Sequence, residues 1–278
     1  MASAPVAVAL GPPGILPRMD RLVVALDGPG SSGKSSVGAA AARPAAMRRL
    51  VVALDGPGSS GKSSVGAAAA REVGYRFCDT GLLYRAVTWL AEERGVSVDD
   101  SEGLVDLVTD VELADDGGGR LARVRVDGVD HTDDVRRPAV EAAVSSVSAV
   151  PELRAALLDR QRALAERGGI VMAGRDIGTV VLPDADLKIY LDASVEERAR
   201  RRAEQRGLDP TGPAGIAILE ALGRRDRLDT NRAVAPLRVA PDARVITTDG
   251  NELDDTVASV VGAIRDAEAR LAPASTQR

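Results

Sequence analysis

The strongest constraint on the fold of this chain is the stretch LVVALDGPGSSGKSS, in which an apolar run leads directly into a glycine-rich loop. Residues Gly56–Ser63 fit the pattern G-x-x-x-x-G-K-[ST], and an alanine-rich stretch typical of a helix follows. In a strand, loop and helix of this kind, successive backbone amides turn toward phosphate oxygens, and the helix N-terminus adds its positive dipole end. The pattern therefore predicts a nucleoside triphosphate site, in preference to a glycine–serine linker that matches by chance.

One lysine and one hydroxyl in this loop have defined tasks in such a site. Lys62 is expected to reach the β- and γ-phosphates, and the Ser63 hydroxyl is expected to ligate Mg²⁺. Of the 36 basic residues, only Lys34, Lys62 and Lys188 are lysines. A compact ammonium fits a tight phosphate cradle better than a planar guanidinium does, which explains why the loop keeps a lysine in an arginine-rich chain.

The loop occurs twice, because residues 21–43 and 49–71 are identical. The second copy continues into YRFCD and a further helical stretch, as in a βαβ unit, whereas Pro44 ends the helix of the first copy. If the first copy formed the central strand, an apolar segment of the second would be left unpaired. We therefore expect the second copy to hold the nucleotide, and residues 1–46 to be a non-functional extension ahead of a natural start at Met47. The first copy still competes for the strand position, since its local propensities are identical.

Composition excludes several classes of protein. The net charge of −5 and the pI of about 5.2 argue against a protein that coats nucleic acid. The single Cys78 rules out an intrachain disulfide, fits a reducing compartment, and reads as a small buried residue rather than a nucleophile. The N-terminal apolar run contains prolines and lacks the basic segment of a signal peptide, and no stretch approaches the ~18–20 apolar residues of a membrane span. We expect a soluble, cytoplasmic monomer, although the sequence does not itself fix the oligomeric state.

The remainder of the chain reads as alternating strands and helices. IVMAGRD and LKIYLD are apolar runs suited to buried parallel strands, and the polar–apolar alternation around DDGGG predicts an antiparallel hairpin. The other expected elements are a helix over about 98–110, two helices separated before Pro151, a charged helix after Ser194, a basic helix after the breaker cluster DPTGPAG, and a last strand and helix. This order implies an α/β fold with a doubly wound parallel sheet and an inserted lobe made of the hairpin and its helices.

Arginines and aspartates provide the charge that a phosphoryl-transfer site needs. Arg175 and Asp176 follow the buried strand IVMAG, at the end where open α/β sheets bind their ligands. Arg85 and Arg232 would join Arg175 as bidentate clamps on a second substrate that carries a phosphate. An aspartate there could accept from an exocyclic amine, as carboxylates do with cytosine N4. The basic run Arg198–Arg202, by contrast, is more typical of a solvated helix face.

Five segments of the chain together resemble bacterial cytidylate kinases: LDGPGSSGKSS, FCDTGLLYRA, VSSVSAVPELRAALLDRQRA, MAGRDIGTVVLPDADLKIYLDAS and RRDRLDTNRAVAPL. The resemblance covers residues 47–271 in order. It implies a three-layer P-loop nucleoside monophosphate kinase fold with a CMP-binding insert at about 111–165, a mobile lid at about 201–225 and a tail at 272–278. It also implies transfer of the γ-phosphate of ATP to CMP or dCMP, with Mg²⁺ as cofactor and no nucleic-acid or membrane partner.

The same resemblance implies the roles of individual residues. Lys62, Arg175 and Arg232 would be catalytic, and Ser63 would bind the metal. The residues implied for ATP are Gly56, Pro57, Gly58, Ser59, Ser60, Gly61, Lys62, Ser63 and Ser64; for the base, Ser145, Arg154 and Asp176; for the ribose, Arg225 and Asp229; for the acceptor phosphate, Arg85, Arg175 and Arg232; and Asp79 also lies on the substrate side.

Two positions depart from the family pattern, and two other functions compete with the one that it implies. Leu228 and Thr230 stand where the family often has polar or basic residues, which affects the finer lid contacts. One rival is another kinase of this fold, acting on UMP, dTMP or a non-nucleotide acceptor. The second is an inert nucleotide-binding regulator. Against the regulator stands the number of Arg and Asp residues at several strand ends, which exceeds what binding a nucleoside triphosphate alone requires.

Overall fold

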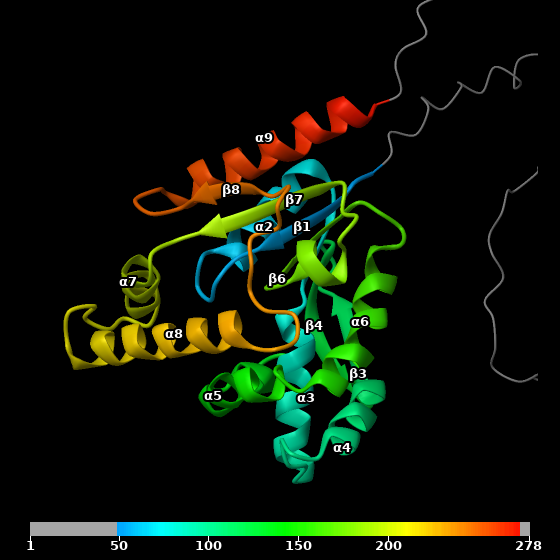
Figure 1. Ribbon diagram of the computed structural model, residues 1–278, viewed down its shortest axis with the longest axis vertical. Coiled ribbons are helices and arrows are strands. Elements are labelled where there is room, and N and C mark those ends of the chain that lie inside the picture. The colour runs from blue at the N-terminus through cyan, green and yellow to red at the C-terminus, as the bar shows by residue number, and fades with distance from the viewer. Residues whose placement is uncertain (1–48, 273–278) are drawn as a thin grey trace, which may run out of the picture. The chain divides into compact units, whose positions relative to one another are not determined.

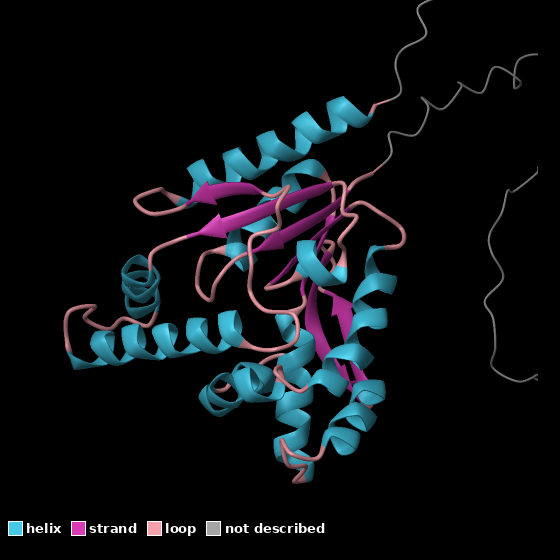
Figure 2. Cartoon of the chain, in the orientation of Figure 1, coloured by secondary structure: helices cyan, strands magenta, loops and turns pink. Residues whose placement is uncertain are grey.

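The computed structural model describes residues 49–272, which lie in one compact unit spanning Met47–Arg278. The first copy of the loop, the expected extension over residues 1–46, and all but the first residue of the expected tail lie outside the described residues. Within 49–272, β1, β2, β6 and β7 are each followed by a helix or helical turn, as the sequence predicted for the parallel sheet, while β3, β4 and β5 follow one another directly (Figure 2). No helix in this part of the chain is long and apolar enough to span a membrane.

Five neighbouring strands of the sheet are parallel, in the order β2 (Arg76–Asp79), β6 (Ile170–Gly174), β1 (Val51–Asp55), β7 (Leu187–Asp192) and β8 (Arg244–Thr247), with β8 at the edge (Figure 1). Central strand β1 pairs on both sides, with Val52 opposite Val171 on β6 and Leu187 on β7. The predicted parallel sheet is confirmed. Because the strands are parallel, their carboxyl ends meet at one edge, and the loops that follow them gather there.

Helices cover both faces of this sheet, which gives the expected three layers. One face carries α2 (Lys62–Val73) and α9 (Leu253–Leu271), and the other carries α6 (Pro151–Ala165) and a π-helical turn, η3 (Ile177–Val181). Side chains alternate along β1, so Leu54 packs toward α2 and α9 while Ala53 packs on the opposite side. Gly66 lets α2 lie close to the sheet, since a Cβ there would come within 2.5 Å of the Phe77 ring.

The predicted hairpin forms, and it is part of the same sheet. Strands β3 (Val111–Asp115) and β4 (Arg120–Val126) are antiparallel, and β5 (Val129–Asp130) pairs with β4. Strand β4 also pairs in parallel with β2, which puts Cys78 opposite Leu121. The insert (residues 111–165) therefore shares a continuous sheet with β1, which the sequence pattern did not predict. Cys78 is fully buried, and burial raises the pKa of its thiol to about 12, as expected for a packing residue.

A second apolar core lies beneath the hairpin. It joins β3, β4 and α6 to α3 (Gly81–Arg94), α4 (Ser101–Asp106), a 3₁₀ turn (Leu107–Asp110) and α5 (Pro138–Val147). The helix predicted over about 98–110 is wrong in extent: Asp100 Oδ1 accepts from Gly103 N at 2.9 Å, so the helix begins only at Ser101. The two helices predicted around the break before Pro151 are confirmed as α5 and α6.

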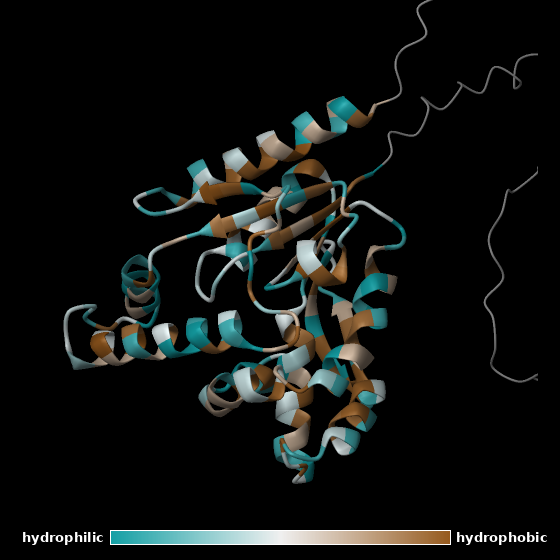
Figure 3. Cartoon of the chain, in the orientation of Figure 1, coloured by the Kyte–Doolittle hydropathy of each residue, from teal (hydrophilic) through white to brown (hydrophobic). Residues whose placement is uncertain are grey.

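The charged helix predicted after Ser194 and the basic helix predicted after DPTGPAG pack against each other. Helix α7 (Val195–Gln205) begins after Ser194, whose Oγ accepts from Glu197 N at 3.2 Å, and Pro213 starts α8 (Pro213–Asn231). Ala203 and Leu222 belong to the small apolar core between them, while hydrophilic residues cover much of α7 (Figure 3). The expected lid region, 201–225, lies within this helical hairpin, from the second half of α7 into α8.

Candidate active site

A cavity of about 650 Å³ lies where the carboxyl ends of the parallel strands meet. Residues 58–64, which follow β1, line it together with Asp79 at the end of β2 and Arg175 after β6. Side chains from α7 and α8 also line it. Open α/β sheets bind ligands at this edge, so the fold brings the predicted phosphate loop and the predicted arginines to one place.

Glycines give the phosphate loop its tight turn. Gly56 has a φ of 148° and Gly61 a φ of 92°, values at which side chains are strained. A Cβ on Gly56 would lie 2.2 Å from the carbonyl oxygen of Leu191, so only glycine fits between the loop and β7. Residues 58–64 line the cavity, whereas Gly56 and Pro57 shape the loop from behind.

Lys62 is buried within this loop and is only 6% exposed. Its Nζ donates to the Pro57 carbonyl oxygen at 2.5 Å and to Ser60 Oγ at 3.3 Å. Burial, followed by the charge of Arg175, lowers the pKa of Lys62 well below its ordinary value. An anion beside a buried ammonium favours its charged form, so this arrangement suits a polyanionic ligand such as a triphosphate.

Ser63 and Asp79 together fit a magnesium ion. The Ser63 hydroxyl donates to Asp79 Oδ2 at 2.5 Å, and Gly81 N donates to the other carboxylate oxygen at 3.0 Å. Hydroxyl and carboxylate oxygens at the end of a phosphate loop are ligands that Mg²⁺ prefers, and its remaining ligands are normally phosphates and waters.

A buried ion pair lies on the insert side of the cavity. Arg154 Nη2 is 2.5 Å from Asp176 Oδ2, and both side chains are only 7% exposed. Arg232 Nη2 lies 3.4 Å from the other oxygen of Asp176, and the Arg154 guanidinium lies 5.3 Å from the ring centre of Tyr84. Arg154 Nε has no partner among the described residues. A buried donor without a partner, in a charged cavity, is a group that a polar ligand can satisfy.

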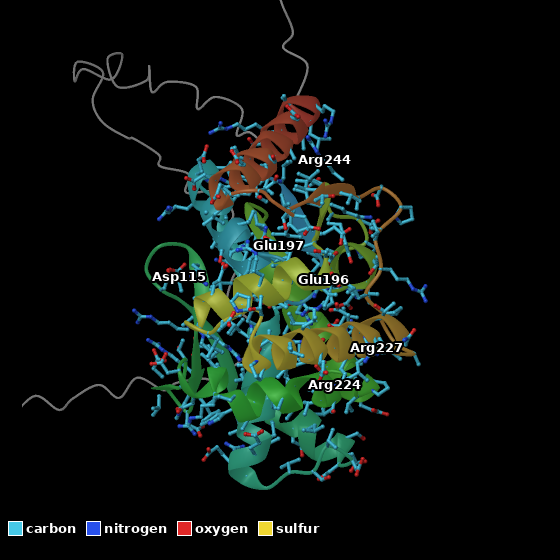
Figure 4. All side chains as sticks on the ribbon, turned by 90° about the vertical axis from the view of Figure 1, so that its left-hand side faces the viewer. Asp115, Glu196, Glu197, Arg224, Arg227 and Arg244 are labelled. Atoms are coloured by element: carbon cyan, nitrogen blue, oxygen red, sulfur yellow. The ribbon has the colours of Figure 1, made fainter. Side chains whose placement is uncertain are left out.

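A second ion pair joins β6 to α8. Arg175 Nε lies 2.8 Å from Asp229 Oδ2. Burial alone would raise the pKa of Asp229, but the charges of Arg175 and of two further arginines, Arg225 and Arg232, hold it below its ordinary value. Burial, then the charge of Arg175, lowers the pKa of Arg225 to about 10. Arg225 lines the cavity, whereas its neighbours on α8, Arg224 and Arg227, are exposed (Figure 4).

Every predicted substrate residue except Ser145 lines this cavity; they are Asp79, Arg85, Arg154, Arg175, Asp176, Arg225, Asp229 and Arg232. Ser145 instead lines an adjacent cavity of about 750 Å³ beside the C-terminal end of α8, together with Leu228. Ser148, one turn further along the chain, lines the main cavity. Asp229 and Arg232 line both cavities, so Ser145 is close to the predicted substrate side without contributing to the main cavity.

Asp55 is a positioning residue that the sequence analysis missed. It ends β1 and is buried, and its two carboxylate oxygens accept from Ile177 N at 2.8 Å and Gly178 N at 2.7 Å. These amides begin the π-helical turn that directly follows Arg175 and Asp176. By holding this turn, Asp55 fixes the backbone position of both residues. The available signal was its place in LDGPG, an acidic residue at the end of an otherwise apolar strand.

Asp55 should also make stability depend on pH in an unusual direction. Burial raises its pKa from 3.8 to about 6, so the folded chain binds this proton more tightly than the unfolded chain does. Its contribution to the free energy of unfolding therefore falls as the pH rises from about 4 to about 6. We expect the free energy of unfolding of the wild type, relative to Asp55→Asn, to drop by about 2 kcal/mol over that range in urea denaturation. A difference that is constant or grows with pH would contradict a raised pKa.

Arg198, in the basic run that was expected to be solvated, is buried. Its Nε donates to the Ala193 carbonyl oxygen at 3.0 Å, and its Nη1 donates to the Gly58 carbonyl oxygen at 3.0 Å. Its Nη2 lies 2.5 Å from Asp226 Oδ2 on α8. Arg198 therefore ties the phosphate loop to both helices of the hairpin, and the prediction of a solvated face is wrong at this position.

The next two arginines of the run have different surroundings. Arg200 is about half exposed and pairs with Glu197 and Glu204 on its own helix, as a solvated face would. Arg201 also contacts Glu197, but its Nη1 donates to Thr248 Oγ1 at 2.9 Å across the cavity. The helical period thus buries Arg198 against the neighbouring helix, whereas Arg200 and Arg201 both line the cavity, Arg200 with about half of its side chain exposed.

The segment after β8 also lines the cavity, and the sequence analysis gave it no role. Thr248, Gly250 and residues 251–253 lie on the same cavity as the phosphate loop, with Thr256 in the first turns of α9. The signal was the position of TTDGNE at the end of a predicted parallel strand, where the same rule that identified Arg175 applies.

The chain is similar to proteins of known family over most of its length. The family described as Cytidylate kinase matches residues 52–266. A cytidylate kinase from Symbiobacterium thermophilum is 46% identical over 246 residues, which cover 86% of this chain and 94% of that protein. A bifunctional pantoate ligase/cytidylate kinase from Synechococcus sp. (strain RCC307) is 44% identical over 251 residues, or 89% of this chain and 44% of that protein. A solved gluconokinase from Sinorhizobium meliloti 1021 has a TM-score of 0.43 and 16% identity, covering 81% of this chain and 97% of that one.

Proposed function

Since this chain belongs to the cytidylate kinase family, we propose that it transfers the γ-phosphate of ATP to CMP or dCMP, giving ADP and CDP or dCDP. The observation that carries the proposal is the contact between the two sides of the cavity. A Cβ on Gly58, in the phosphate loop, would lie 3.3 Å from Nη2 of Arg175, on the acceptor side. A triphosphate on the loop and a phosphate on Arg175 would therefore meet in one cavity, as in-line transfer requires.

The donor side holds the triphosphate by charge and by backbone amides. Lys62 would contact the β- and γ-phosphates, and the N-terminus of α2, which begins at Lys62, adds its positive dipole end. Ser63, with Asp79 hydrogen-bonded to it, would hold Mg²⁺, which when bound neutralises charge on the β- and γ-phosphates. These groups orient the γ-phosphate toward the arginines opposite.

The acceptor side binds the phosphate of the nucleoside monophosphate. Arg85, Arg175 and Arg232 all line the cavity, and their guanidinium groups can each pair two phosphate oxygens. Their positive charge would stabilise the charge that spreads over the transferred group in the transition state. A phosphate monoester is largely ionised at pH 7, so its attacking oxygen needs no strong general base.

The buried ion pairs would recognise the nucleoside. Asp176 can accept from the exocyclic N4 amine of cytosine, and Arg154, paired with it at 2.5 Å, keeps its carboxylate oriented. UMP carries a carbonyl oxygen at that position, which would face the carboxylate without a donor between them. Asp229 and Arg225 would contact the ribose.

Water has to be kept from the γ-phosphate, because ATP would otherwise be hydrolysed. We propose that the helical hairpin containing residues 201–225 is the lid that does this. Arg198 links it to the Gly58 carbonyl oxygen at 3.0 Å, so movement of the hairpin and the shape of the phosphate loop would be coupled.

We also propose that the protein acts as a monomer in the cytoplasm without a nucleic-acid partner. The net charge of −5 and the single, fully buried Cys78 support this setting. Size-exclusion chromatography coupled to light scattering would test the oligomeric state.

Product formation tests the proposed function directly. Purified protein should release ADP and form CDP or dCDP when supplied with ATP, Mg²⁺ and CMP or dCMP, and it should turn over UMP and dTMP much less efficiently. A coupled ADP assay with each acceptor in turn, and chromatography of the nucleotide products, measures this. A preference for another acceptor would assign a different kinase activity, and ATP binding with no product would indicate a regulator.

A further inference from the structure

Among residues 49–272, the carboxylate of Glu141 joins the insert to the proposed lid hairpin. Glu141 lies on α5, and its side chain is 23% exposed. One of its oxygens pairs with Arg202 Nη2, and the other accepts from Arg206 Nη2 at 2.9 Å. Arg202 lies in the last turn of α7 and Arg206 directly follows the helix, so Glu141 connects two parts of the chain that would move relative to each other if the hairpin is a lid.

The surroundings of Glu141 are strongly positive. Burial alone would raise the pKa of Glu141, but the charges of Arg202, Arg85, Arg206 and Arg225 hold it below its ordinary value. These arginines come from α3, from the end of α7 and from α8. Phosphate oxygens are the other anions that such a cluster attracts, so the carboxylate stands in the field that the substrates would use.

Arg202 contacts both the Glu141 carboxylate and the phosphate loop. Its Nη1 donates to Ser59 Oγ at 3.3 Å, and it lines the main cavity, whereas Glu141 does not. Its Nη2 is occupied by Glu141. A guanidinium that keeps its carboxylate partner has fewer N–H groups, and less net charge, to offer to a phosphate.

We propose that Glu141 is a positioning residue that restrains Arg202, so that its carboxylate competes with the phosphates of ATP for this guanidinium. This inference rests on the proposed function, because it takes the phosphate loop to bind ATP. When ATP is bound without an acceptor, Arg202 would then stabilise its phosphates less, and hydrolysis of ATP by water would be slower. Glu141 thus limits how far the positive charge of Arg202 on α7 is available to the phosphates of ATP.

Glu141→Gln removes the charge and keeps the shape of the side chain. We expect the Kd for ATP, and for a non-hydrolysable analogue, to fall about two- to fivefold, the range of a partly exposed ion pair. ADP release in the absence of CMP should rise by a similar factor. Calorimetric titration and a coupled ADP assay measure the two quantities. Unchanged or weaker ATP binding would overturn the proposal, since Glu141 would then be neutral or would orient Arg202 toward the phosphates.

Two further variants show whether Glu141→Gln acts by releasing Arg202 or simply by removing a negative charge from the protein. Glu220→Gln removes a carboxylate that pairs with the exposed Arg224 on α8, away from the main cavity, and should leave both quantities at the wild-type level. In an Arg202→Gln background, Glu141→Gln should no longer change the Kd for ATP; a change that persists would show that Glu141 does not act through Arg202. Failure to form CDP would refute the proposed function, while ATP binding would still test the restraint.

Discussion

Replacing Lys62 with alanine is expected to lower kcat/KM for CMP phosphorylation about 10³-fold or more. Within residues 49–272, Lys62 is the only lysine that lines the cavity, and it is held in the turn of the phosphate loop. The arginines around the cavity cannot replace it, because a planar guanidinium does not fit inside the loop. A coupled assay of ADP release, at low and at saturating CMP, measures the loss in kcat and in kcat/KM.

The first copy of the loop provides a matched control for this experiment. Lys34 occupies the same position in an identical stretch, and it lies outside the described residues. We expect Lys34→Ala, and a variant that begins at Met47, to keep wild-type kcat/KM. Loss of activity in Lys34→Ala, with activity retained in Lys62→Ala, would assign the nucleotide to the first copy of the loop and exclude Lys62 as the residue that contacts it.

Features that depend on contiguous residues could be predicted from the sequence. The strand, loop and helix around Gly56–Ser63 form as expected, because the glycines, the apolar run and the helix signals are adjacent in the chain. Arg175 and Asp176 could be placed at the cavity because they directly follow a buried parallel strand. In each case a local pattern fixes the element, and the topology of a parallel sheet fixes the edge.

Features that depend on contacts between distant residues could not be predicted. The pairing of β4 with β2 joins Cys78 to Leu121, and nothing in either stretch specifies its partner. Asp55 was missed because its two hydrogen bonds reach across to residues 177–178, more than 100 positions further along the chain. Ser145 was assigned to the base through its place in a motif, whereas the orientation of α5 puts it on the adjacent cavity.

The basic run on α7 illustrates the same limit. In sequence, Arg198, Arg200 and Arg201 are equivalent members of a charged helix. In the fold, Arg198 is 3% exposed and bonded to the phosphate loop, while Arg200 is about half exposed. Charge counts alone favoured a solvated face, because they carry no information about which residues face the neighbouring helix.

Replacing Arg175 with alanine is expected to lower kcat about 10²- to 10³-fold, with a much smaller change in the Kd for ATP. Arg175 lies between the two halves of the cavity: its Nη2 is next to Gly58 in the phosphate loop, and its Nε pairs with Asp229 at 2.8 Å. A guanidinium in that place can contact the transferred phosphoryl group as well as the acceptor phosphate, so its largest contribution should appear in the transition state. Steady-state kinetics and calorimetric ATP titration separate the two effects.

Arg175→Ala also leaves Asp229, whose side chain is only 6% exposed, without its closest partner, which should lower the free energy of unfolding. Arg175→Lys retains the positive charge but loses the planar fork, so it should restore much of the free energy of unfolding and little of kcat. Arg244→Ala, which removes an exposed pair with Asp266 outside the cavity, should leave kcat unchanged. If Arg175→Lys recovered kcat fully, Arg175 would act as a point charge that steadies Asp229, and its bidentate role in phosphoryl transfer would be wrong.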